Sequence, residues 1–217
     1  LLIVMVFTIA VSAQEDADDD YIRADRLGIA HISAYTEDTP PERYQRALEV
    51  GAGWNRFPIY WNVVHPDDTT WDWSLFDRQV INDLSYGLNI NAILIGRPEF
   101  FADGNSLVGI NEPVFSDGTD VPGEGKTLNR DNPWVDFVSR AVNRYRPGGD
   151  LAMMGLLPED QGITVWEIWN EPDLETFWSA GFRSYARLLK ISYLAAKHTD
   201  PNAQIMFGGL LYNTGVN

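Results

Sequence analysis

The sequence contains no cysteine, so disulfide bonds play no part in its stability and the fold depends on the packing of its core. Histidine is almost as scarce, with three residues far apart in the chain, His31, His65 and His198. A transition-metal site needs several such ligands at short spacing, and the sequence shows no cluster of that kind. We therefore expect a protein that holds neither a metal ion nor a cofactor.

Positive charge is also in short supply. Lysine and arginine number 16 against 31 aspartate and glutamate residues, which gives a formal net charge of −15. Nucleic acid and anionic membrane surfaces would repel such a chain, so we expect neither as a partner. A neutral carbohydrate is compatible with this charge, and the sequence leaves the oligomeric state open.

A hydrophobic run long enough to cross a membrane is missing as well. The N-terminal run LLIVMVFTIAVSAQ is shorter than the roughly 20 residues that a spanning helix needs. Its end, Val11-Ser12-Ala13, fits a signal-peptidase site, and an acidic segment follows. We interpret residues 1–13 as part of a signal peptide and residues 14–26 as an acidic tether, and we expect bacterial-type export to a secreted or extracytoplasmic location. The alternative is a buried N-terminal strand.

Beyond the tether, short apolar runs alternate with amphipathic stretches. The runs predict strands, and apolar residues at helical spacing, with proline before or glycine after, predict helices. The expected strands are 27–35, 54–61, 88–96, 162–170 and 203–212, and the expected helices are 40–53, 73–87, 133–148 and 181–201. This alternation is typical of a parallel sheet in an α/β fold. Hydrophobic residues make up 45% of the chain, which suffices for one buried core.

A glycine-rich loop after the first strand is absent, and this absence separates two parallel architectures. A doubly wound nucleotide-binding sheet often has such a loop, whereas this chain continues with SAYTEDTPPERY, which contains no glycine. We therefore favour a (β/α)8 or TIM barrel, whose reactive groups lie in the loops after the strands. A full barrel takes about 250 residues, so we interpret residues 27–217 as its N-terminal part, truncated after five strands and four helices. The long loop 103–131 should rise over the active-site face.

The tripeptide Asn-Glu-Pro occurs twice, in different surroundings. The copy at 170–172 follows the predicted strand TVWEIW, so Glu171 stands at the rim of a buried strand among aromatic residues. Partial desolvation there favours a protonated carboxyl group, as a general acid requires. The copy at 111–113 lies in the glycine-rich loop, where nothing in the sequence predicts rigidity or exclusion of water, and we interpret it as a turn.

The stretch WEIWNEPDLETFW, residues 166–178, resembles the fourth-strand motif of the clan A glycoside hydrolases. Within that clan it is most similar to family 39 sequences and related bacterial members of the cellulase type, and weaker similarity extends over about 27–217. The resemblance implies a retaining TIM-barrel glycosidase in which Glu171 is the acid/base and Asn170 contacts the sugar beside the scissile bond. It also implies that Arg56 holds and tunes the nucleophile. The alternative for Arg56 is a structural ion pair with a barrel carboxylate such as Glu167.

Three further side chains are candidates for contact with a sugar. His31, which follows the apolar start of the first strand, is expected either to reach the floor of the pocket or to be a core histidine. Trp61 and Trp178 are expected to stack on a sugar, with core packing as the alternative. For Trp166 and Trp169, which lie within the predicted strand, we favour core packing.

The nucleophile that the resemblance implies, a second glutamate after the seventh strand, has no counterpart in this sequence. Retaining hydrolysis needs two carboxyl groups about 5 Å apart, and Glu99 and Glu112 are no substitute because both follow the third strand. We therefore expect the full-length protein to hydrolyse O-glycosyl bonds of a poly- or oligosaccharide by double displacement, and this fragment alone to be inactive. One alternative is a glycan-binding pseudoenzyme. A second is an oxidoreductase, but the lack of a glycine-rich phosphate-binding loop argues against it.

Overall fold

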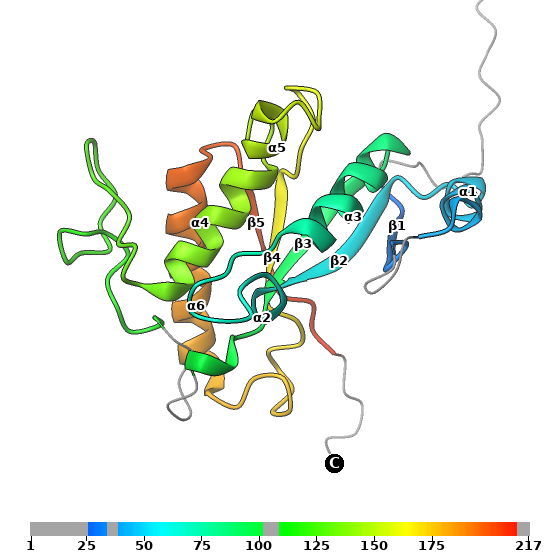
Figure 1. Ribbon diagram of the computed structural model, residues 1–217. Helices are drawn as coiled ribbons and strands as arrows, with labels where there is room; N and C mark the ends of the chain where they lie inside the picture. The colour runs from blue at the N-terminus through cyan, green and yellow to red at the C-terminus, as the bar shows by residue number, and fades with distance from the viewer. Residues whose placement is uncertain (1–25, 34–38, 102–108, 212–217) are drawn as a thin grey trace, which may run out of the picture.

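The computed structural model describes residues 26–33, 39–101 and 109–211. Five parallel strands form one sheet in the order in which they occur in the chain (Figure 1). They are β1 (Gly28–Ala30), β2 (Trp54–Tyr60), β3 (Asn89–Ile95), β4 (Val165–Ile168) and β5 (Gln204–Phe207). A parallel sheet in strict sequential order is the arrangement of a (β/α)8 barrel. The predicted α/β class is therefore confirmed.

The strands are joined by four long helices, α1 (Pro41–Glu49), α3 (Ser74–Ser85), α4 (Pro133–Tyr145) and α6 (Gly181–Thr199). Shorter pieces are α2 (Trp61–Val64), α5 (Asp150–Met153) and the 3-10 turn η1 (Glu99–Phe101). Proline begins α1 and α4, where its missing N–H is no loss. Figure 1 shows α3, α4 and α6 along one face of the sheet.

The two faces of the sheet differ in character, because side chains alternate along each strand. The face toward the helices carries buried apolar residues that form the main core: Phe57, Ile59, Ile90, Ala92, Leu94, Trp166 and Ile168. The opposite face of β2, β3 and β4 carries Arg56, Asn91 and Glu167, which are joined by hydrogen bonds. Three polar residues that are far apart in the chain therefore meet on one face.

All five strands and all four long helices fall within their predicted ranges. The sequence does not predict α2 or α5, because each has only four residues and shows no apolar periodicity. Among the described residues, no helix is both long and apolar enough to cross a membrane. The predicted signal peptide and nearly all of the predicted tether lie outside the described residues.

The loop 109–131 lies beside α4 and α6 rather than over the ends of the strands (Figure 1). Arg187 of α6 pairs with Asp120 of the loop, and the rings of Phe115 and His198 lie 5.6 Å apart. Since α6 runs opposite to the strands and His198 is near its end, Phe115 lies toward the end of the sheet where the strands begin. The prediction that this loop covers the active-site face is therefore wrong for residues 109–131, because contacts with α6 draw the loop onto the helical layer.

Candidate active site

A buried ion pair between β2 and β4 organises the polar face of the sheet. Arg56 donates from Nε to Glu167 Oε2 and from Nη2 to Glu167 Oε1, both at 2.7 Å. The side chain of Glu167 is 2% exposed and that of Arg56 is 29% exposed. The hydrogen bond to Glu167 raises the pKa of Arg56. Burial by itself would raise the pKa of Glu167, but its hydrogen bonds, first among them that from Arg56, outweigh burial and lower it.

Glu167 accepts hydrogen bonds from three segments of the chain. Besides the two from Arg56, Asn91 Nδ2 donates to Oε2 at 3.0 Å and the backbone N–H of Gly209 donates to Oε1 at 2.7 Å. These bonds occupy the lone pairs that a carboxylate offers, so Glu167 is an anchor and not a free nucleophile. Sequence reasoning missed Asn91 and Gly209. The available signal for Asn91 was a polar residue within an otherwise apolar strand.

The chain makes a strained turn directly after β4. Trp169 and Glu171 have φ angles of 66° and 48°, which residues other than glycine seldom adopt. Each backbone N–H is held, that of Trp169 by the carbonyl of Leu94 at 3.0 Å and that of Glu171 by the carbonyl of Gly209 at 2.8 Å. The indole N–H of Trp169 also donates to the carbonyl of Phe177 at 2.9 Å. Strain held in this way fixes the directions of the side chains, as is common at functional sites.

Asn170 lies in this turn and is oriented by Arg56. The Nη2 of Arg56 donates to Asn170 Oδ1 at 2.7 Å, in addition to its bond with Glu167. Because the amide oxygen is engaged, the Nδ2 group of Asn170 remains as a donor for a ligand. One guanidinium therefore both joins the strands and sets the hydrogen-bonding character of Asn170.

A cavity of about 470 Å³ lies at the ends of β2, β3 and β4. Arg56, Tyr60, Ile95, Trp169 and Asn170 are among its lining residues. Its volume is in the range of small-ligand pockets, about 300–1,000 Å³. The ends of the strands are also where TIM-barrel enzymes carry their active sites. We therefore take this cavity as the candidate active site.

Glu171 lies beside this cavity rather than among its lining residues. The residue is partly buried, and its charge helps to raise the pKa of Arg56 after the larger effect of Glu167. The carboxyl group is therefore within electrostatic range of the guanidinium. The structure thus gathers Arg56, Asn170 and Glu171 around one end of the sheet.

The two tryptophans expected to stack on a sugar are buried instead. Trp61 is 0% exposed and packs on Phe137, with ring centroids 5.3 Å apart, and Trp178 is 5% exposed with its indole N–H bonded to a backbone carbonyl. The prediction is wrong for both, because each ring fills the hydrophobic core. Trp169 packs against the core as expected, with its ring centroid 5.2 Å from that of Trp178. It also lines the cavity, because β4 ends one residue earlier and the chain turns there.

His31 follows β1, is exposed and lines the cavity. Of the two expected positions, the pocket and the core, the structure places it at the pocket. Burial of part of the ring, together with the charges of Arg56 and Arg43, lowers its pKa. The imidazole is therefore neutral at neutral pH. Within the described ranges, no group of three or more histidine, aspartate or glutamate side chains is placed to hold a metal ion.

The first Asn-Glu-Pro copy belongs to a different part of the molecule. The interpretation of a turn is confirmed, since the N–H of Glu112 donates to the carbonyl of Gly109 at 3.1 Å. The expectation that nothing holds this segment rigid is wrong, because Arg187 and Asn132 both donate to the carbonyl of Glu112. The residue itself remains exposed. Glu112 does not line the cavity and is no partner for Glu171 there.

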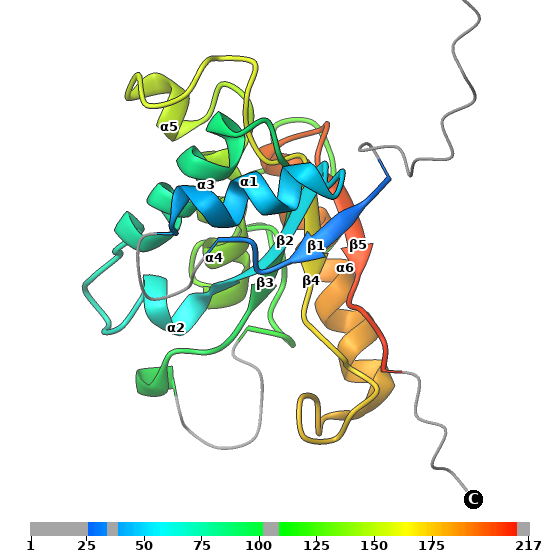
Figure 2. The ribbon, with the colours of Figure 1, turned by 90° about the vertical axis from the view of Figure 1, so that its right-hand side faces the viewer.

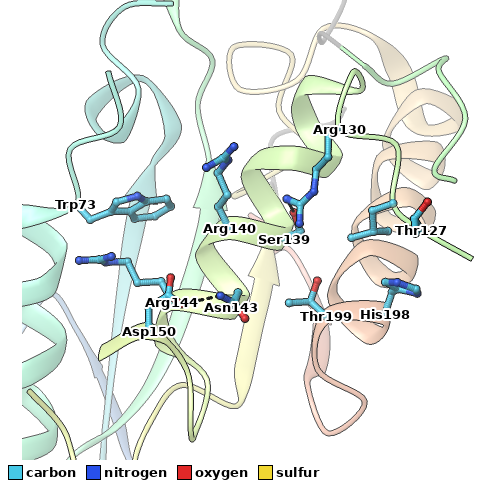
Figure 3. A pocket seen from close by; sticks show the side chains of 11 residues that line it. Trp73, Thr127, Arg130, Ser139, Arg140, Asn143, Arg144, Asp150, His198 and Thr199 are labelled. Carbon is cyan, nitrogen blue, oxygen red and sulfur yellow. Dashed lines mark hydrogen bonds between the residues drawn. The ribbon is translucent and has the colours of Figure 1, made fainter. Parts of the chain in front are cut away.

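A larger cavity of about 910 Å³ lies on the outer side of α4 (Figure 3). Arg130, Arg140 and Arg144 line it, but the first two pair with Asp136 and the third pairs with Asp77. Figure 3 shows the three guanidinium groups pointing in different directions, so they do not converge on one ligand atom. None of the predicted site residues lines this cavity, and the candidate site remains the smaller one.

Comparison with known proteins bears on the fold of the chain. No protein-family model matches the chain. A β-xylosidase of Geobacillus stearothermophilus is 29% identical over 75 residues, which are 34% of this chain and 14% of that protein. A family 39 glycoside hydrolase from Bacteroides cellulosilyticus WH2 matches with a TM-score of 0.53 at 17% identity, over 84% of this chain and 31% of that chain. A glucosidase from Croceicoccus marinus gives 0.52 at 16%, over 84% and 35%.

The chain thus spans about a third of the length of these solved structures. At such low identity the likeness concerns the fold, and the neighbours are TIM-barrel glycoside hydrolases, as the resemblance to clan A implies. The predicted architecture is therefore confirmed: the chain has the fold of the N-terminal part of a (β/α)8 barrel of the kind found in glycoside hydrolases.

Proposed function

We propose that the full-length protein is an exported, retaining glycosidase that hydrolyses O-glycosyl bonds in an oligo- or polysaccharide. The observation that carries the proposal is that Arg56 and Asn170 line one cavity at the strand ends and that Glu171, the next residue in the chain, lies within electrostatic range of Arg56. Further support comes from the similarity of 75 residues to a β-xylosidase.

In this mechanism Glu171 first protonates the glycosidic oxygen while a second carboxylate attacks the anomeric carbon. In the second step Glu171 takes a proton from the water that releases the sugar. Asn170 donates from Nδ2 to a sugar hydroxyl, because Arg56 occupies its Oδ1. The oxygens of Glu167 are fully engaged, so we assign the nucleophile to a part of the protein beyond the described residues.

The acid/base assignment is tested by Glu171→Gln in the full-length protein. Glutamine keeps the shape of the side chain but carries no proton to donate, so kcat/KM for glycosides with poor leaving groups should fall by about 10²–10⁴-fold. Aryl glycosides with good leaving groups need little protonation and should lose far less in the first step. Added azide, which attacks without a general base, should restore release of the activated sugar.

The matched control is Glu175→Gln, an exposed glutamate four residues further along the same segment. It should leave both classes of substrate within a few-fold of the unmodified protein. Unchanged turnover of unactivated glycosides by the Glu171 variant would rule the assignment out. Tight oligosaccharide binding without turnover by the unmodified protein would favour the glycan-binding pseudoenzyme instead.

A further inference from the structure

We propose that Glu167 is a positioning residue that neutralises Arg56 and so keeps this guanidinium from forming an ion pair with the acid/base Glu171. The proposal deepens the function proposed above and rests on it. Glu167 touches no substrate in this arrangement, since its side chain is 2% exposed beneath Arg56. Its effect on the reaction is carried through the charge of Arg56.

Arg56 has two carboxyl groups within electrostatic reach, those of Glu167 and Glu171. Glu167 accepts hydrogen bonds from Nε and Nη2 of Arg56 at 2.7 Å each. Nη2 donates a second hydrogen bond to Asn170 Oδ1, also at 2.7 Å. Glu171 makes no hydrogen bond to Arg56, yet its charge acts on the guanidinium. Two carboxylates could therefore pair with Arg56, and in the structure the ion pair forms with Glu167.

Several charged or titratable groups lie near Glu171 among the described residues. His31 after β1 and Arg56 on β2 line the cavity, Glu167 on β4 pairs with Arg56, and Asp173 and Glu175 follow Glu171 in the chain. Arg97 follows Gly96, which lines the cavity after β3, while Asn91 and Gly209 contribute neutral donors to Glu167. His31 is neutral at neutral pH because its pKa is lowered. Arg56 is thus the cation that is hydrogen-bonded to the turn carrying Glu171, and Glu167 is the carboxylate that neutralises it.

An unpaired charge away from water is costly. If Glu167 loses its charge, the partly buried Arg56 loses the carboxylate that pairs with it among the described residues, and the described carboxyl group that still acts on it is that of Glu171. Pairing with Arg56 stabilises the ionised form of a carboxyl group. An ionised Glu171 has no proton for the leaving group, so the loss of Glu167 should appear as a loss of general acid.

Four variants of the full-length protein test this chain of effects through the pH dependence of kcat. Glu167→Gln keeps the shape but not the charge, and the high-pH limb should move down by about one pH unit or more. Arg56→Gln removes the cation and leaves the negative charge of Glu167, so the limb should move up. The double variant should fall between them, and Glu167→Asp, which keeps the charge, should return the limb toward that of the unmodified protein.

The substrate dependence adds a second readout. Above the shifted limb, Glu167→Gln should lose about tenfold or more of its kcat on poor leaving groups and much less on activated aryl glycosides. A purely structural role would lower both equally and leave the pH profile in place. Such a result, with the variant folded, would overturn the proposal.

A measurement that needs no turnover separates this proposal from the proposed function. The side-chain carboxyl of Glu171 is followed by ¹³C NMR during a pH titration, with its signal assigned from the Glu171→Gln variant. The midpoint should fall in Glu167→Gln and rise in Arg56→Gln. If Glu167→Gln does not fold, the double variant should still titrate lower than Arg56→Gln, and equal midpoints would refute the role of Glu167 even in a protein that hydrolyses no glycoside.

Discussion

At the scale of single residues, Asp83 joins α3 to α1, to β2 and to the segment after β1, away from the candidate site. It is 0% exposed and accepts hydrogen bonds from Tyr44 Oη at 2.9 Å and from Asn55 Nδ2 at 2.6 Å. Asn55 also donates to Ser33 Oγ at 2.8 Å. Burial raises the pKa of Asp83 to about 6, although these hydrogen bonds oppose the change.

This raised pKa predicts a pH-dependent stability. Because the value in the folded state is above that in the unfolded chain, the protonated form is favoured by folding. The contribution is fully present below about pH 4 and is lost as pH rises through about 6, which amounts to about 3 kcal/mol. In urea denaturation between pH 4 and 7, the free energy of unfolding of the unmodified protein should fall more steeply with rising pH than that of Asp83→Asn. The exposed control Asp68→Asn should show the same pH dependence as the unmodified protein. Parallel curves for all three proteins would contradict the shift.

Site residues were predictable from the sequence where a motif fixes the backbone position, and not where exposure depends on packing. The motif located Asn170 and Glu171, and the structure brings both near Arg56. It could not show that Trp61 and Trp178 are buried, because a tryptophan near a strand end has the same sequence pattern in a core and in a subsite. The catalytic role of Glu171 and the sugar-binding role of Asn170 are proposals.

At the scale of elements, proline and glycine at the boundaries made the helices and strands predictable. The extent of pairing was not predictable. The first strand was expected over 27–35, of which residues 34–35 lie outside the described residues. Within 27–33, β1 pairs with β2 over Gly28–Ala30, because the chain turns at His31, where φ is 60°. Among the described strands, β1 has β2 as its one neighbour, so no second row of hydrogen bonds supports a longer strand.

The junction between β4 and β5 depends on a close approach at Gly208. A Cβ atom there would lie 2.9 Å from the carbonyl oxygens of both Ile168 and Trp169, whereas a Cβ on Gly209 would meet Arg56 Nη2 and Glu167 Oε1 at ordinary distances of 3.4 and 3.6 Å. We therefore expect Gly208→Ala to lower the free energy of unfolding by about 1–3 kcal/mol. Gly209→Ala is the matched control and should cost less than about 1 kcal/mol in a urea titration. Equal costs would argue against backbone contact as the cause.

At the scale of the whole molecule, the loop 109–131 is fastened to the helical layer by Arg187. The side chain donates to the carbonyls of Ile110 and Glu112 at 2.9 and 2.8 Å and pairs with Asp120. The sequence could not predict this destination, because the loop and α6 are separated by about 70 positions and only the folded chain brings them together.

If this loop is a support and not a cover for the site, releasing it should leave the chemistry intact. Arg187→Met should make residues 109–131 several-fold more sensitive to limited proteolysis, with kcat/KM of the full-length protein unchanged within about twofold. Lys190→Met, which removes only a 3.4 Å contact with Asp120, should change the cleavage rate little. A large loss of activity in the Arg187 variant would place the loop in the reaction after all.

The strand order also bears on how the polypeptide can be handled in the laboratory. Among the described strands, β5 pairs with β4 alone, and Met206 and Phe207 on it are 43% and 50% exposed. An open, apolar strand of this kind is a template onto which another copy can add. We therefore expect this polypeptide to aggregate through the exposed edge of β5 when it is produced alone, and its production requires that this edge be covered.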